Sequence, residues 1–119
     1  MQKISYIKLM ADYCSTGLWS KDGTVLELAD LPISPELGTA ITKWVQWYDV
    51  HNKDYLPLDE RAEFPLQDFS NVGKELATKL KTEMPQTQVF YFDEAAWDHA
   101  FLTKGANATK IQSDYLYEI

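Results

Sequence analysis

A single cysteine and two histidines are the side chains of this sequence best suited to covalent or acid–base chemistry. A nucleophilic mechanism would combine the thiol with a histidine base and a carboxylate that orients it, and the candidates are Cys14, His51, His99, Asp49 and Asp98. No motif of a cysteine-enzyme family surrounds Cys14, and a lone cysteine after a strand is more often a small buried apolar residue. We therefore expect that the chain is not an enzyme.

Two short clusters combine histidine with carboxylates, as a metal site would require, namely Asp49-Val50-His51 and Asp98-His99. Neighbouring residues on a helix point in different directions, because only positions three or four apart share a face. The sequence contains no HExxH motif, no Asp-rich calcium loop and no glycine-rich phosphate loop. We expect neither a metal site nor a bound cofactor.

Carboxylates that could act as a pair in glycoside or general acid–base chemistry fall close together in the first quarter of the chain. They are Asp12, Asp22, Glu27 and Asp30. Acidic residues near turns are usually hydrated and have no chemical role, and the pair Asp22-Gly23 is itself a turn signal. We interpret this group as solvent-exposed surface.

The composition favours one globular domain with an acidic surface. The 119 residues include 11 Lys or Arg and 18 Asp or Glu, which gives a net charge of −7 at pH 7. Affinity for phosphate backbones comes mainly from Lys and Arg, so this charge argues against a nucleic-acid partner and favours a basic protein. With 45% hydrophobic residues the chain can build a core, and we expect a single domain over residues 1–119.

The cellular compartment is also constrained by the sequence. One cysteine excludes an intramolecular disulfide framework and fits a reducing environment. No signal-like apolar segment lies near the N-terminus, and no stretch approaches the roughly 20 apolar residues of a membrane-spanning helix. We expect a cytoplasmic protein without a membrane partner.

Two amphipathic helices are the clearest predicted elements. The first has Ser34 as its N-cap and Pro35 in its first position, and its apolar stripe is Leu37, Ala40, Ile41, Trp44, Val45 and Tyr48. The second begins near Asp68 or Ser70 and stops before Pro85. A glycine inside a helix costs roughly 1 kcal/mol relative to Ala, so Gly73 indicates the close approach of another element.

Strands are predicted at both ends of the chain and between them. Alternating or apolar runs indicate strands over Ile4 to Asp12, Thr24 to Leu28, Val89 to Phe92 and Ile111 to Ile119, and a short third helix is expected from Glu94 to Leu102. A long loop, Lys53 to Gln67, joins the two main helices. The expected fold is α+β, with a small antiparallel or mixed sheet and both main helices packed on one face.

Negative charge gathers after the first helix, beside aromatic residues. The net charge is −3 over residues 53–68 but +1 over residues 69–84. Carboxylates around an aromatic anchor suit a protein partner with a basic cleft, because long-range attraction speeds encounter and buried aromatics supply affinity. The predicted contact residues are Trp47, Asp49, Asp54, Tyr55, Asp59, Glu60 and Glu63. Trp47 and Tyr55 fit the core as well as a partner interface, whereas Tyr48 fits the core.

A second acidic segment offers an alternative contact face. Residues 85–119 also carry a net charge of −3, and their candidate contacts are Asp93, Glu94, Trp97 and Asp98.

Several segments together resemble a group of small acidic bacterial proteins. They are Tyr-Ile-Lys-Leu-Met-Ala-Asp-Tyr-Cys at 6–14, Leu18-Trp19, Leu-Pro-Ile-Ser-Pro-Glu-Leu at 31–37, Trp-Val-Gln-Trp-Tyr-Asp at 44–49 and Gly-Lys-Glu-Leu-Ala-Thr-Lys-Leu at 73–80. The similarity covers about residues 6–92. Most of the group is uncharacterised, and some members resemble immunity proteins of polymorphic toxins, including contact-dependent growth inhibition systems.

This resemblance implies a protein that binds and neutralises a cognate toxin domain. Many such toxins are nucleases, whose clefts must be basic to hold phosphate, so an acidic inhibitor would occlude the cleft without turnover. Two other classes remain open: a non-catalytic binding or regulatory domain unrelated to toxins, and a small hydrolase that uses Cys14, His51 or His99. The oligomeric state is also open.

Overall fold

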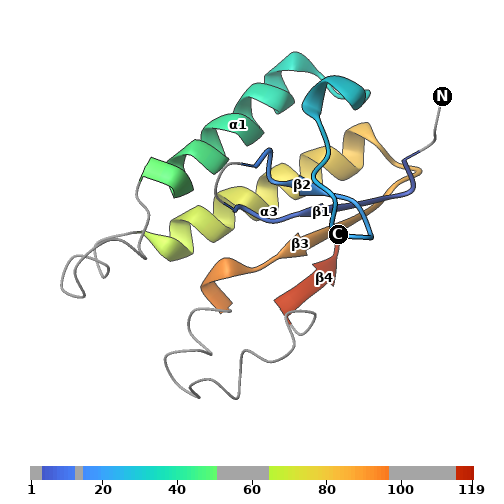
Figure 1. Ribbon diagram of the computed structural model, residues 1–119. Coiled ribbons are helices and arrows are strands. Elements are labelled where there is room, and N and C mark those ends of the chain that lie inside the picture. The colour runs from blue at the N-terminus through green and yellow to red at the C-terminus, as the bar shows by residue number, and fades with distance from the viewer. Residues whose placement is uncertain (1–3, 13–14, 51–64, 97–114) are drawn as a thin grey trace.

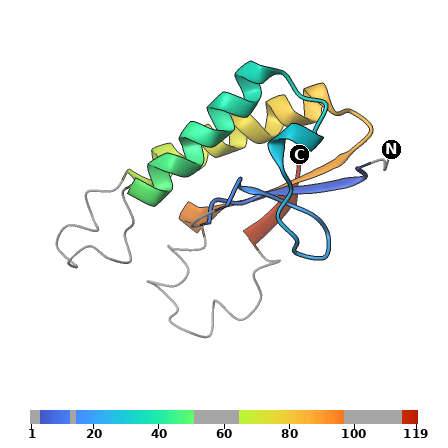
Figure 2. The same cartoon turned by 45° about the horizontal axis from the view of Figure 1, so that its top comes forward.

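A four-stranded sheet covered on one face by two antiparallel helices forms the body of the protein. The computed structural model describes residues 4–12, 15–50, 65–96 and 115–119. The elements are β1 (Tyr6–Leu9), β2 (Leu18–Trp19), the 3-10 turn η1 (Leu28–Asp30), α1 (Pro35–Val50), α3 (Leu66–Glu83), β3 (Gln88–Phe92) and β4 (Leu116–Glu118). Both long helices lie on the same side of the strands (Figures 1 and 2). The predicted α+β fold is therefore confirmed.

The sheet is mixed, with strand order β2-β1-β3-β4. The central strands β1 and β3 run parallel, and each pairs with an antiparallel edge strand. Because parallel neighbours need a crossover connection, the chain between them contains both long helices. Ile7 and Leu9 pair with Val89 and Tyr91, and all four side chains are buried on the helix side.

The start of α1 is fixed by hydrogen bonds. The Leu37 N–H donates to Ser34 Oγ at 3.2 Å, which confirms the predicted N-cap. The Ser34 N–H and hydroxyl in turn donate to the two carboxylate oxygens of Glu83, at 2.6 and 2.8 Å. Since Glu83 is the last residue of α3, these bonds tie the start of one helix to the end of the other.

The second helix has the predicted end but an earlier start. It begins at Leu66, two residues before Asp68, because the Pro65 carbonyl already accepts the Phe69 N–H at 2.9 Å. It ends at Glu83, where the Met84 N–H still donates to the Leu80 carbonyl and Pro85 follows. The three residues 65–67 of the predicted loop therefore belong to the helix and its cap.

Gly73 lies where α1, α3 and the sheet meet. A Cβ atom at this position would sit 2.5 Å from Trp44 Cζ2 and 2.5 Å from the Tyr91 hydroxyl oxygen. That hydroxyl donates to the Ser70 carbonyl at 2.8 Å, and burial raises the pKa of Tyr91, which keeps the donor proton in place. The close approach predicted from Gly73 is confirmed.

The strand predicted over Thr24 to Leu28 is wrong. Only Val25 forms an isolated bridge, to Trp19, and Leu28 begins the 3-10 turn. The Thr16 hydroxyl donates to the Leu26 carbonyl at 2.5 Å, so a side chain takes the acceptor that a strand ladder would use. The last strand occupies Leu116–Glu118, inside its predicted range. Residues 94–96 are helical as predicted, and the rest of that short helix lies outside the described residues.

Candidate partner-binding surface

The last turn of α1 carries the described part of the predicted contact surface. Trp47 and Asp49 both lie there, in the helix Pro35–Val50. The other five predicted contacts fall outside the described residues, and they are Asp54, Tyr55, Asp59, Glu60 and Glu63. We use the name acidic end of α1 for Trp47 and Asp49 together with residues 51–63, which follow the helix in the sequence.

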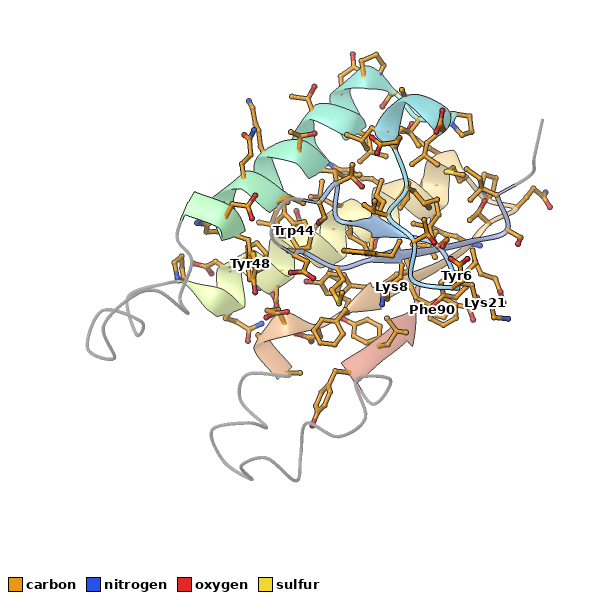
Figure 3. The ribbon with its side chains drawn as sticks, in the orientation of Figure 1. Tyr6, Lys8, Lys21, Trp44, Tyr48 and Phe90 are labelled. Carbon is orange, nitrogen blue, oxygen red and sulfur yellow. The ribbon has the colours of Figure 1, made fainter. Side chains whose placement is uncertain are left out.

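An aromatic cluster fastens this end of α1 to the start of α3. Phe69, fully buried, stacks on Trp44 with ring centroids 4.6 Å apart and an interplanar angle of 9°. The Trp44 indole N–H also donates to the Phe69 carbonyl at 2.9 Å. Tyr48 lies 5.6 Å from the same ring and is buried, so its predicted place in the core is confirmed (Figure 3). The chain therefore leaves α1 and enters α3 at a rigidly packed point.

Trp47 is half-buried and belongs partly to this cluster. Its ring meets Phe69 edge to face, with centroids 5.5 Å apart at 73°. Of the two places that the sequence allows for Trp47, core and partner interface, the packing on Phe69 supports the core for part of the ring. Its place in a partner interface stays a prediction.

Asp49 has an electrostatically unfavourable position. Within the described part of the chain, its buried Oδ1 atom has no hydrogen-bond partner. Burial raises the pKa of Asp49, and the negative charge of Asp12 raises it further. The last turn of α1 contains no basic residue, and a carboxylate there also opposes the partial negative charge of the helix C-terminus.

The proximity of Asp12 to Asp49 is a feature that sequence reasoning missed. The two residues lie 37 positions apart, and Asp12 was assigned to hydrated surface with its neighbours in the chain. The fold brings Asp12, which follows β1, near enough to Asp49 for its negative charge to raise the pKa of that carboxyl group. No local pattern signals such a contact between distant segments.

Residues 5–94 match a protein family described as Serratia CdiI immunity protein-like. The chain belongs to this family. No curated protein matches the sequence. The matched range contains β1, both long helices and β3, as well as all seven predicted contact residues, so the family core coincides with the sheet and helices that support the acidic end of α1.

Half of the alternative acidic face lies beyond the family match. Trp97 and Asp98 follow the matched range and fall outside the described residues. Asp93 Oδ1 accepts the Ala96 N–H at 3.1 Å and so caps a helical turn, while Glu94 is buried. In this family member, the described carboxylates of the alternative face therefore support local structure.

The residues considered for catalysis receive no support from the described structure. Cys14, His51 and His99 all lie outside it. Across residues 4–12, 15–50, 65–96 and 115–119, no group of three His, Cys, Asp or Glu side chains could hold a metal ion. Asp22 accepts hydrogen bonds from the Ser20 hydroxyl and the Thr24 N–H, and these bonds lower its pKa, as expected of a turn residue.

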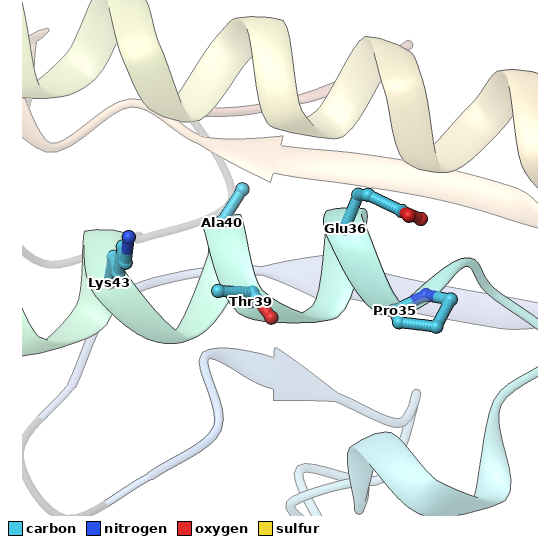
Figure 4. Close-up of a pocket in the computed structure, with 5 residues that line it drawn as sticks. All are labelled: Pro35, Glu36, Thr39, Ala40 and Lys43. Atoms are coloured by element: carbon cyan, nitrogen blue, oxygen red, sulfur yellow. The ribbon is translucent and has the colours of Figure 1, made fainter.

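Two depressions on the surface of the described residues are lined by neither Trp47 nor Asp49. One follows the outer face of α1 and is lined by Pro35, Glu36, Thr39, Ala40 and Lys43 (Figure 4). The other lies between η1 and the end of α3, where Leu31, Pro32 and Met84 form apolar walls. Glu83 borders it, but its carboxylate is already bound to Ser34.

No helix within the described residues is long and apolar enough to cross a membrane.

Proposed function

We propose that this protein is an immunity protein that binds a cognate toxin domain and neutralises it with the acidic end of α1. The observation that carries the proposal is membership of the CdiI immunity protein-like family over residues 5–94, a range that includes this whole surface. The toxin domain is expected to be a nuclease, whose basic active cleft the acidic surface would cover. The mechanism is occlusion without turnover.

The state of Asp49 supports this role. Its Oδ1 atom lacks a partner in the described structure, and the charge of Asp12 lies close by. An arginine or lysine of a basic cleft that approaches this carboxylate would stabilise its ionised form, because a nearby opposite charge offsets both the burial of the group and the negative charge of Asp12. The features that make this site unfavourable in the isolated chain therefore become favourable when a basic partner binds.

The aromatic cluster supports the same role. Trp44, Tyr48 and Phe69 hold the two helix ends in one arrangement before any partner binds. A surface presented by a rigid base loses less conformational entropy on association than a loosely held one. The exposed part of Trp47 would then serve as the apolar anchor beside the charges.

The first test is binding to the toxin domain encoded by the neighbouring upstream gene. The two purified proteins should form a stable complex whose affinity falls as salt rises, and co-expression should protect cells from the toxin. A D59K/E60K/E63K triple variant should bind at least about 100-fold more weakly, because several charge contacts become repulsive.

A matched variant controls for net charge. E27K/D30K/E36K makes the same change in charge at exposed positions near the start of α1, and it should bind the toxin as the parent does. Equal affinity of the first triple variant and the parent would exclude the acidic end of α1 as the contact. Absence of both a complex and protection would leave a regulatory domain unrelated to toxins as the better account.

Catalysis is tested separately. C14A, H51A and H99A variants should neutralise the toxin as well as the parent does, because occlusion needs no nucleophile or base. If one of them folds but loses protection while still binding the toxin, the inhibitor acts by a chemical step and occlusion is the wrong mechanism.

A further inference from the structure

The face of the sheet opposite the helices carries an ordered row of side chains. Residues that are directly paired on neighbouring strands project to the same face. Lys8 pairs with Trp19 on one side and with Phe90 on the other, and Phe90 pairs in turn with Glu118. One row across all four strands therefore reads Trp19, Lys8, Phe90, Glu118.

This row points away from the two long helices. Successive strand residues alternate between faces, and the neighbours of Lys8 and Phe90 in their strands are fully or almost fully buried on the helix side. In Figure 3, Lys8 and Phe90 lie on the far side of the strands from Trp44 and Tyr48. Lys8 and Phe90 are half-buried and Glu118 is exposed.

The middle of this face is aromatic, and its charges lie on either side. Tyr6 stacks on Phe90 with centroids 5.0 Å apart and an interplanar angle of 28°. Lys8 stands one strand away from Phe90 in one direction, and Glu118 one strand away in the other. Within the row, a positive charge on one side of Phe90 and a negative charge on the other are complementary to their own image after a two-fold rotation about an axis parallel to the strands.

We propose that this face binds a second copy of the chain in a symmetric dimer. With the two-fold axis near Phe90, Lys8 of each protomer meets Glu118 of the other, and the Tyr6–Phe90 stacks pack together. A two-fold interface requires each charge to find its opposite across the axis, and this row meets that requirement. A strongly basic partner would instead leave Lys8 opposite a like charge.

The face is small for a protein interface. Standard interfaces use roughly 20–30 residues a side, and the row with its immediate neighbours supplies far fewer. We therefore expect a weak dimer that forms only at high protein concentration. The row lies on the sheet face opposite α1, which carries Trp47 and Asp49, so this inference does not depend on the proposed function.

The test is sedimentation equilibrium of the full chain and its charge variants over a range of concentrations. The parent should show concentration-dependent dimers, and K8E or E118K alone should weaken self-association at least about tenfold. An equimolar mixture of K8E with E118K should dimerise again, because each charge then meets its opposite across the axis. K43E, at an exposed position of α1, should leave self-association unchanged.

Several results would overturn the dimer. The parent could stay monomeric up to about 1 mM, or the two variants could fail to associate when mixed although their thermal unfolding shows that each is folded. If K8E lowered affinity for the toxin domain while self-association stayed unchanged, the occupant of this face would be the toxin and the dimer would be wrong.

Discussion

The two ends of α1 are built in opposite ways. At the start, the backbone and side chain of Ser34 make three hydrogen bonds, to Leu37 and to the carboxylate of Glu83. At the end, Asp49 holds a buried oxygen atom without a partner in the described structure, near a second carboxylate, in a helix turn that has no basic residue. Within the described residues, the start of α1 therefore satisfies its polar groups, whereas the end leaves one buried carboxylate oxygen without a hydrogen-bond partner.

Helix dipole, burial and the charge of Asp12 all disfavour the ionised form of Asp49. Natural sequences break local rules mainly at functional sites. This is why the proposed function places a partner contact at this end of the helix. We therefore expect that mutations at the two ends of α1 change the stability of the fold in opposite directions.

Removing the aromatic cluster should have the largest effect. F69A deletes a fully buried ring that contacts Trp44, Trp47 and Tyr48, and should lower the free energy of unfolding by about 3–5 kcal/mol. V72A, at an exposed position of the same helix, should change it by less than about 0.5 kcal/mol. Urea unfolding of both variants measures the difference, and similar losses would show that the cluster does not fasten the helix ends.

Adding one methyl group in each helix should give effects of opposite sign. G73A places a Cβ atom 2.5 Å from Trp44 and from the Tyr91 hydroxyl, so it should destabilise the fold by about 1–3 kcal/mol. G38A meets no atom within 4 Å and should stabilise α1 by about 0.5–1 kcal/mol through helix propensity. A G73A protein as stable as the parent in thermal melting would contradict the tight contact between α1, α3 and β3.

The start of α1 should respond to loss of its cap. S34A removes the acceptor for the Leu37 N–H and one donor to Glu83, and should cost about 1 kcal/mol of stability. T39A, at an exposed position one turn further along α1, serves as the control and should have almost no effect. If chemical denaturation gave the two variants equal stability, the helix start would not be the satisfied end that the hydrogen bonds indicate.

Removing the carboxylate at the end of α1 should raise the stability of the fold, by the smallest amount of these changes. The raised pKa of Asp49 means that the folded state holds its proton over a pH range in which the unfolded state, with a pKa near 3.8, has lost it. Stability from this group is therefore present at low pH and is lost as pH rises through the folded-state pKa. D49N should be more stable than the parent at pH 7, by less than the loss in S34A, and the gap should close toward pH 3.

Thermal melts of D49N and the parent from pH 3 to pH 8 check this sign. E36Q, which removes an exposed carboxylate at the favourable end of the same helix, should show no gain at pH 7. A parent that is more stable than D49N at neutral pH would mean that Asp49 has a stabilising partner.

Local patterns were sufficient to predict most of the helical layer. The cap at Ser34, the buried stripe with Ile41 and Trp44, and the close contact at Gly73 all follow from spacing and residue type. The helix α3 begins two residues before Asp68 because the Pro65 carbonyl accepts the Phe69 N–H, so the helix needs no side-chain cap at its start.

Contacts between distant segments could not be predicted in the same way. The parallel pairing of β1 with β3 joins residues about 82 positions apart. Its register determines which side chains form the row on the sheet face opposite the helices. The effect of the Asp12 charge on Asp49 depends on packing between distant segments in the same way. So does the hydrogen bond from the Thr16 hydroxyl to the Leu26 carbonyl, which lies where the sequence predicted a strand. Of the seven predicted contacts, Trp47 and Asp49 could be placed by helical periodicity, and the other five follow the helix end.

The most direct test of the account compares the affinity of the parent and of D49N for the cognate toxin domain by isothermal titration calorimetry at pH 7. The account predicts that D49N, although more stable on its own, binds the toxin at least about tenfold more weakly, while E36Q binds as the parent does. Unchanged toxin affinity in D49N would contradict the claim that the acidic end of α1 is reserved for a basic partner.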